Sequence, residues 1–260
     1  IQRRHICHLA TTGEGKTTTA QVACLNNAQA TNGVDLVVDP KGGFADELLP
    51  MWYHETGSIE NVTVIDGSTS LPRIPLFDLR PYLDHPEIRI SRQRLIEIVV
   101  DGAIGVFEAA AFDSGFREAP QALKLLRSVM FALFASGIDC FSIEDLYSEL
   151  SQIAEGTFSV GVSDVRFQQL LDQITQESAK MRRALANGAM RRLHPMMHNS
   201  LTADAFGTPP TDPSDQWDFY GTLDSDEVVL CDLGGLNSFR REFLARVIVS
   251  RFFVAGRLRQ

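Results

Sequence analysis

The sequence lacks the long apolar segments that mark a membrane protein. No uninterrupted apolar run reaches the roughly 20 residues that a transmembrane helix needs. The first residues, Ile1 to Arg4, lack the apolar region of a secretory signal peptide. We therefore expect a cytoplasmic protein, in which any contact with the cytoplasmic face of a membrane would come from parts outside these 260 residues.

Cysteine and positive charge are also scarce. The four cysteines lie far apart and form no Cys-x-x-Cys pair, which is typical of small core residues in a reducing compartment. The formal net charge is −9 and the isoelectric point is about 5.1, so no overall field attracts nucleic acid and any DNA contact must be local. The apolar content of 44% is enough for one large core or two modest ones.

A phosphate-binding motif lies near the N-terminus. Residues 10–17 read Ala-Thr-Thr-Gly-Glu-Gly-Lys-Thr, which is the P-loop (Walker A) pattern with Ala10 in place of the first glycine. Gly13 and Gly15 of this motif have no side chains, which allows the backbone N–H groups to point at an anion. Lys16 would then bind the β- and γ-phosphates of ATP, and the Thr17 hydroxyl would coordinate Mg²⁺. The residues that we expect to contact the nucleotide are Thr12, Gly13, Glu14, Gly15, Lys16, Thr17 and Thr18.

The surroundings of this motif favour a nucleotide site. Residues 5–9 predict a short strand, and Lys16 to Ala30 predict a helix that closes at Asn32-Gly33. The start of this helix would place its free N–H groups and its partial positive charge at the phosphates. The alternative is an ordinary glycine-rich turn between a strand and a helix.

Three further segments predict a parallel sheet. Residues 34–39, 61–66 and 227–233 are rich in apolar residues, and each has an aspartate at or near its end. A helix is expected from Phe44, disturbed at Pro50. The alternation of strands and helices up to residue 66 predicts an α/β fold with helices on the faces of the sheet.

The middle of the chain predicts helices with hardly a strand. Three apolar stripes recur at helical spacing; they are Ile96, Val99, Val100, Ala103 and Ile104, then Leu123, Leu126, Val129, Met130 and Leu133, then Ile143, Leu146 and Leu150. Ser142 is expected to cap the third helix, with Asp145 at its third position. Residues 208–218 predict a loop, and residues 239–258 predict a final helix.

These patterns divide the chain into three segments. Residues 1–84 would form the first part of a nucleotide-binding domain, residues 85–200 an all-helical insertion, and residues 201–260 the returning strand and helix of that domain. The sheet is thus expected to be interrupted by the insertion and then resumed.

Three motifs in this order resemble those of the HerA/FtsK-type P-loop ATPases. They are the loop at 10–17, Val-Val-Asp-Pro-Lys-Gly-Gly at 37–43, and Val-Val-Leu-Cys-Asp-Leu-Gly-Gly-Leu at 228–236, with the helical block between the last two. Residues 191–198, followed by Ala205-Phe206, are similar to the stretch before the returning strand in that group. Within the superfamily the sequence is most similar to conjugative coupling proteins and type IV secretion ATPases of the TraG, TraD and TraC kinds.

The resemblance implies a RecA-like domain with an all-α insertion, assembled as a hexameric ring that hydrolyses ATP with Mg²⁺. It also implies partners in a conjugation or secretion machinery and, in the DNA translocases, contact with DNA. In that group a further strand ends in Asp-Glu, which holds Mg²⁺ and polarises the attacking water. The chain contains no such strand, and we expect the catalytic glutamate and the arginine finger beyond Gln260, so that the domain is incomplete at its C-terminal side. Asp232 ends an apolar strand but has no glutamate after it, and we do not expect it to be that Mg²⁺ ligand.

Asp39 is a second candidate catalytic residue beside Lys16. A carboxylate at the carboxyl end of a strand next to a P-loop has Mg²⁺ or the attacking water within reach. The alternative is that Asp39-Pro-Lys-Gly only forms a turn. Lys41 in this turn could contact phosphate or a neighbouring subunit.

The best local candidate for DNA contact is the acid-free segment 178–203. If it is helical throughout, Lys180, Arg183 and Arg191 lie within about 80° of one another and can follow a phosphate backbone. Ordinary surface charge is the alternative. His194 and His198 could share a helix face and bind a metal, but Pro195 and the missing glutamate between them favour a loop at a helix end.

These observations support three functional hypotheses. The first is an ATPase motor that hydrolyses ATP and translocates DNA in conjugation or type IV secretion. The second is an ATPase that energises the assembly of a secretion apparatus, or protein transport through it, without touching DNA. The third is a nucleotide-binding module without catalysis.

Overall fold

The structure of the chain is a computed structural model. It describes residues 16–27, 35–69, 71–74, 76–83, 85–110, 120–158, 165–197, 200–207, 209–225 and 227–259. Contacts divide the chain into two compact units. We call residues 1–69 and 224–236 the sheet unit, and residues 70–223 and 237–260 the helical unit. The division of the sequence into residues 1–84, 85–200 and 201–260 is a separate matter from these compact units and stays a prediction.

The described part of the sheet unit contains three parallel strands, β1 (Asp35–Asp39), β2 (Val62–Asp66) and β3 (Val228–Asp232). Their order is β1-β3-β2, so the strand that comes last in the sequence lies between the other two. Residues 228–231 of β3 are all buried, as expected for an apolar strand with a neighbour on each side. The predicted parallel sheet, interrupted by helices and then resumed, is confirmed for these three strands.

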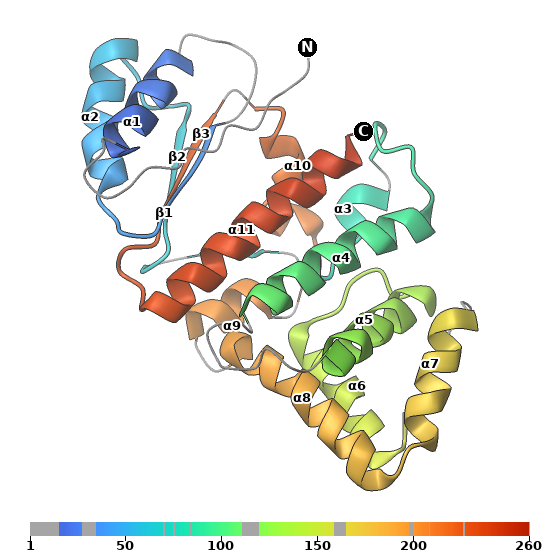
Figure 1. The fold of residues 1–260 in the computed structure, drawn as a ribbon. Helices are drawn as coiled ribbons and strands as arrows, with labels where there is room; N and C mark the ends of the chain where they lie inside the picture. The colour runs from blue at the N-terminus through green and yellow to red at the C-terminus, as the bar shows by residue number, and fades with distance from the viewer. Residues whose placement is uncertain are drawn as a thin grey trace. The chain divides into compact units, whose positions relative to one another are not determined.

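Two helices cover one face of these strands (Figure 1). They are α1 (Lys16–Asn27) and α2 (Phe44–Thr56). Cys24 of α1 and Leu48 and Trp52 of α2 form one apolar core with Val228 and Leu230 of the central strand. Burying a side chain the size of Leu48 or Trp52 contributes about 2–3 kcal/mol, so this core fixes both helices on the sheet.

Helix α2 continues past Pro50 to Thr56, although the sequence predicts a disturbance there. Proline removes one backbone hydrogen bond and crowds the preceding turn. The buried residues of α2 lie on both sides of the proline, at Phe44, Ala45 and Leu48 before it and at Trp52 after it. Their burial holds the helix together across position 50.

The described part of the helical unit consists mainly of helices. In the described residues these are α3 (Arg80–Leu83), α4 (Arg92–Ala110), α5 (Pro120–Ala135), α6 (Ile143–Glu155), α7 (Val165–Gln176), α8 (Ala179–Met197), α9 (Ser200–Phe206), the 3-10 helix η1 (Pro213–Asp215), α10 (Phe219–Thr222) and α11 (Ser238–Leu258). Helices α4 and α11 run side by side, and α6 packs against α8 (Figure 1). The three predicted apolar stripes lie on α4, α5 and α6, and most of their residues are buried.

The start of α6 matches its prediction in detail. The Ser142 hydroxyl accepts a hydrogen bond from the Asp145 N–H at 3.0 Å, and the Asp145 carboxylate accepts one from the Ser142 N–H at 2.8 Å. This reciprocal capping box satisfies two N–H groups that the helix itself cannot pair. Gly156 closes the other end of α6 in the left-handed conformation.

A buried carboxylate joins two loops of the helical unit. Asp78 has no exposed surface, and its two oxygens accept hydrogen bonds from the Arg80 guanidinium at 2.9 and 2.7 Å. Gln216 donates a third from the loop before α10, at 2.9 Å. Because a buried carboxylate needs such partners, Asp78 fixes the segment before α3 against residues 209–216.

The described helices include none that is both long enough and apolar enough to cross a membrane.

Candidate functional site

The carboxyl ends of the three strands form one edge of the sheet unit. Asp39, Asp232 and Asp66 are the last residues of β1, β3 and β2, and they occupy matching positions in the register. In open parallel sheets with covering helices, ligands bind outside this edge. The edge is therefore a candidate ligand site.

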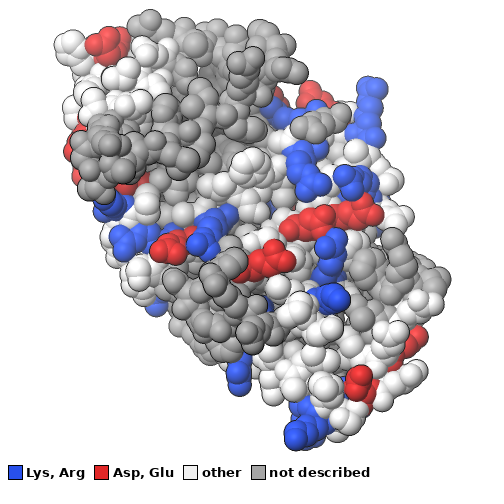
Figure 2. Space-filling model, in the orientation of Figure 1, with Lys and Arg blue, Asp and Glu red and all other residues white. Residues whose placement is uncertain are grey.

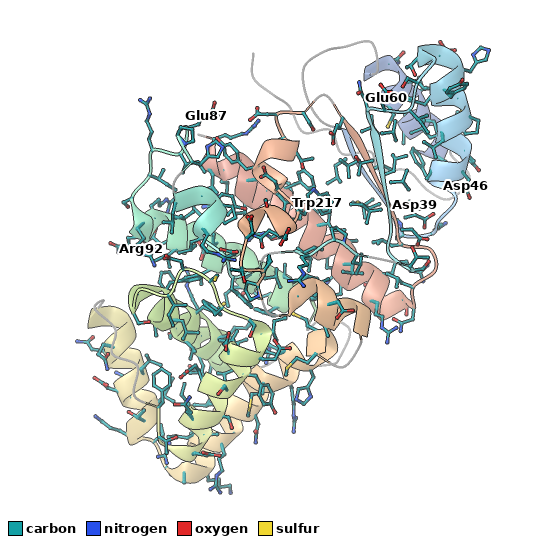
Figure 3. The ribbon with its side chains drawn as sticks, turned by 180° about the vertical axis from the view of Figure 1, so that it is seen from behind. Asp39, Asp46, Glu60, Glu87, Arg92 and Trp217 are labelled. Carbon is teal, nitrogen blue, oxygen red and sulfur yellow. The ribbon has the colours of Figure 1, made fainter. Side chains whose placement is uncertain are left out.

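The N-terminal half of α1 lies at the same edge. Gln21, in the second turn of α1, donates a hydrogen bond to the carboxylate of Glu47 at 2.7 Å. Glu47 lies in the first turn of α2, which starts five residues after the end of β1. Figure 3 accordingly shows Asp39 and Asp46 together, far from Glu60, which precedes β2. The start of α1 is thus brought to the edge where the strands end.

The start of α1 can receive an anion. Its first turn contains no acidic residue, and Thr17 and Thr18 are exposed. The first N–H groups of any helix have no partner within it and carry a partial positive charge. A phosphate group fits such an end, and a lysine and a hydroxyl in the first two residues suit it further.

Asp39 organises the turn that follows β1, residues 40–43. Its Oδ1 accepts a hydrogen bond from the Lys41 N–H at 2.9 Å, and its Oδ2 accepts one from the Phe44 N–H at 3.1 Å. Gly42 and Gly43 have φ angles of 84° and 91°, a region that favours glycine. The predicted turn at Asp39-Pro-Lys-Gly is therefore present. A carboxylate oxygen can accept more than one hydrogen bond, so Asp39 can still bind water or a cation.

Asp232 reaches the same turn from the neighbouring strand. Its Oδ2 accepts a hydrogen bond from the Gly43 N–H at 3.2 Å, and its Oδ1 accepts one from the Gly234 N–H at 2.8 Å. The sequence did not predict this contact between positions 189 residues apart. The only signal for it is that both strands end in aspartate followed within a few residues by a Gly-Gly pair.

Asp66 stabilises a separate turn after β2. Its Oδ1 accepts hydrogen bonds from both the N–H and the hydroxyl of Ser68, at 2.8 and 2.6 Å. These bonds favour the charged carboxylate and lower the pKa of Asp66 below its ordinary value. Because the folded pKa is the lower one, the charged form stabilises the fold at neutral pH, and this contribution is lost as the pH falls through the folded pKa.

The predicted nucleotide-binding residues fall only partly within the described residues. Thr12, Gly13, Glu14 and Gly15, with Ala10 and the strand predicted at residues 5–9, lie outside them. Lys16 is the first residue of α1 and Thr17 the second, as predicted from the motif. The helix was predicted to reach Ala30; α1 ends at Asn27, and residues 28–34 lie outside the described part. The role of each of these residues stays a prediction.

The donor set at this edge fits ATP with Mg²⁺. Mg²⁺ is usually held by one or two protein oxygens, phosphate oxygens and water. Thr17 offers an exposed hydroxyl in the first turn of α1, and Asp39 offers carboxylate oxygens at the carboxyl end of β1. No group of three or more His, Cys, Asp or Glu side chains placed to hold a metal occurs within the described ranges.

The predicted basic segment is helical over most of its length, because α8 spans Ala179–Met197. Lys180, Arg183 and Arg191 are exposed, and α8 contains no acidic residue. The other two arginines of the segment are used internally. Arg182 donates hydrogen bonds to the carbonyl groups of Thr175 and Glu177 near the end of α7, and Arg192 is buried.

The end of α8 differs from the loop predicted at residues 194–198. The helix continues through His194 and Pro195 to Met197, and the His194 ring stacks on Tyr147 of α6 at 5.9 Å. Packing of α8 along α6 outweighs the proline in the last turn. His198, the second residue of the suggested metal pair, lies outside the described residues.

On the visible face of the described residues, basic and acidic side chains are interspersed (Figure 2). This face therefore presents no large patch of one charge sign among the described residues.

Comparison with known proteins gives one match. The model of the family described as "Helicase HerA, central domain" matches residues 1–250. Neither the search of curated proteins nor the search of solved structures found a match.

Proposed function

Because the chain belongs to the family of the helicase HerA central domain, we propose that it binds and hydrolyses ATP as part of a motor that translocates DNA. The observation that carries this proposal is the meeting of two elements at one sheet edge. The helix that starts at the Lys-Thr of the P-loop motif and the Asp39 turn both lie at the carboxyl ends of the strands.

The proposed roles follow from the chemistry of each group. The P-loop residues from Thr12 to Thr18 bind the phosphate groups through backbone N–H groups, and Lys16 binds the β- and γ-phosphates. Asp39, at the carboxyl end of β1, holds either the attacking water or Mg²⁺ opposite the γ-phosphate. These groups stabilise the negative charge of the transferring phosphoryl group, which is the main requirement of phosphoryl transfer.

Thr17 and Asp39 are the residues that would hold Mg²⁺. When bound, Mg²⁺ neutralises charge on the β- and γ-phosphates. The Thr17 hydroxyl at the start of α1 is a direct ligand in this proposal. Asp39 would offer the remaining lone pairs of its carboxylate, which hydrogen bonds from the Lys41 and Phe44 N–H groups hold in the turn.

DNA is the proposed partner of the basic face of α8. Lys180, Arg183 and Arg191 lie on one side of this helix, with no acidic residue along it. Lysine and arginine side chains at such spacing can bind successive phosphates, with an affinity that falls as salt rises. The surrounding net charge of −9 confines binding to this local face.

We further propose that this motor acts in conjugation or type IV secretion. The order of P-loop, Asp39-Pro-Lys-Gly turn, helical block and Asp232-Leu-Gly-Gly end supports it. We propose that the chain acts within a hexameric ring, together with components of that machinery.

Steady-state ATP hydrolysis tests the proposal. We expect the protein to hydrolyse ATP with Mg²⁺, faster with single- or double-stranded DNA, and we expect salt to remove the stimulation. Lys16→Ala should abolish turnover. Lys124→Ala, the same substitution at an exposed lysine of α5, should leave it unchanged.

The outcomes separate the three hypotheses. Turnover that requires Lys16 but ignores DNA would favour the secretion ATPase and contradict the DNA motor. Nucleotide binding without turnover would leave the non-catalytic module. If DNA stimulates turnover, replacing Lys180, Arg183 and Arg191 by glutamine should remove the stimulation and keep the basal rate.

A further inference from the structure

Asp232 joins two loops at the carboxyl edge of the sheet. One of its oxygens accepts the Gly43 N–H of the turn after β1, and the other accepts the Gly234 N–H of the loop after β3. Both oxygens therefore act as acceptors for backbone N–H groups. The side chain of Asp232 thus holds the turn 40–43 against the end of the central strand β3.

The two loops lie in direct contact along their backbones. A Cβ atom at Gly234 would lie 2.5 Å from the Lys41 carbonyl oxygen, and one at Gly42 would lie 3.0 Å from Asp232 Oδ1. Only glycine permits such close approach of two backbones. The position of the turn is thus determined by the end of β3, which lies in the middle of the described strands.

The residue that this turn presents is Lys41. Its side chain is exposed, and the structure gives its ammonium group no carboxylate partner among the described residues. It lies three residues before α2, at the edge that also receives the start of α1. A lysine without an ion pair at the proposed phosphate site can bind a phosphate oxygen.

We propose that Asp232 is a positioning residue of this ATPase site, which holds the turn 40–43 so that the Lys41 ammonium binds the γ-phosphate of ATP. The inference rests on the proposed function, since it concerns the same nucleotide site. Asp232 acts through the backbone of the turn and does not itself touch the nucleotide. Its effect is therefore expected on turnover and not on the initial binding of ATP, for which the P-loop suffices.

Substitution by asparagine is expected to have different effects at Asp232 and at Asp66. At position 232 an amide would direct its NH₂ group at a backbone N–H, because both oxygens are acceptors. At position 66 the N–H and hydroxyl of Ser68 both donate to Oδ1, so the amide oxygen of asparagine can replace this acceptor. Asp66→Asn is therefore a matched control on the neighbouring strand.

The test compares the kcat and the KM for ATP of the protein and its variants. We expect Asp232→Asn to lower kcat by about ten- to a hundredfold, with a KM within about threefold of the original. Lys41→Ala should lower kcat by a similar factor. Asp66→Asn should leave both constants unchanged. The melting temperature of each variant shows whether it still folds. If Asp232→Asn unfolds, Lys41→Ala still tests the inference, because Lys41 is exposed and its substitution should not affect folding.

The double variant tests whether Asp232 works through Lys41. In a Lys41→Ala background, Asp232→Asn should have no further effect on kcat. The inference is overturned if Lys41→Ala keeps the original kcat, if Asp232→Asn behaves like Asp66→Asn, or if the two effects multiply. Absence of Lys16-dependent hydrolysis in the unmodified protein would instead overturn the proposed function, and the inference with it.

Discussion

At the scale of single residues, aspartate carboxylates fix several backbone turns of this chain. Asp39, Asp66 and Asp232 each accept N–H groups just after a strand, and Asp145 does so at the start of α6. The Asp145 contact was predicted because a capping box joins positions three residues apart. The contact from Asp232 to Gly43 was not, because it spans 189 positions and depends on strand order.

Asp78 offers a stability prediction at the same scale. Asp78→Ala should lower the free energy of unfolding by about 2–4 kcal/mol, because it leaves the Arg80 guanidinium and the Gln216 amide without their buried acceptor. Urea unfolding measures this change. Asp172→Ala, at an exposed position of α7, is the control and should change stability by less than about 1 kcal/mol. Equal effects of the two substitutions would contradict the assigned role of Asp78.

At the scale of helices, periodicity and end signals predicted most of what is observed. Helix α1 starts at Lys16, α2 at Phe44, and α11 spans Ser238–Leu258 against a predicted 239–258. The error lies at Pro195, where a loop was predicted but α8 continues to Met197; α2 also continues through Pro50, where a disturbance was predicted. A proline lowers the local preference for helix, but the burial of neighbouring side chains decides, and burial is not visible in a local pattern.

Two glycines of α4 give opposite predictions. A Cβ at Gly102 would lie 2.5 Å from the Val254 side chain of α11, whereas one at Gly105 would meet nothing within 4 Å. We expect Gly102→Ala to destabilise the fold by about 1–3 kcal/mol through overpacking. Gly105→Ala should stabilise it by about 0.5–1 kcal/mol, since alanine favours helix.

Thermal or urea unfolding of the two variants tests the α4–α11 contact. The double variant Gly102→Ala with Val254→Ala should recover part of the loss, because the smaller partner makes room for the added methyl group. A stabilising effect of Gly102→Ala alone would show that these two helices do not pack as described.

At the scale of the whole molecule, the sequence predicted which segments form the sheet but not their order. The apolar run at 228–231 predicted a buried strand, and β3 is indeed buried. Its position between β1 and β2 depends on contacts between residues far apart in the sequence, which a local pattern does not show. The same holds for the helical unit, which is built from residues before and after β3. The P-loop was predicted from its motif alone, and only its helix start falls within the described residues.

The family match indicates the function of this chain in general terms. Residues 1–250 match the helicase HerA central domain, which supports a P-loop ATPase motor in general terms. The DNA partner, the ring and the secretion machinery are proposals that depend on a working nucleotide site. Binding of ATP at the start of α1 is therefore the claim on which the rest of the account depends.

Titration with a fluorescent ATP analogue in the presence of Mg²⁺ tests this claim most directly. We expect the protein and its Lys124→Ala variant to bind with the same Kd. Lys16→Ala should raise the Kd by at least about tenfold, because it removes a charged contact with the phosphates. Equal Kd values for all three proteins would contradict the assignment of residues 10–17 as the nucleotide site.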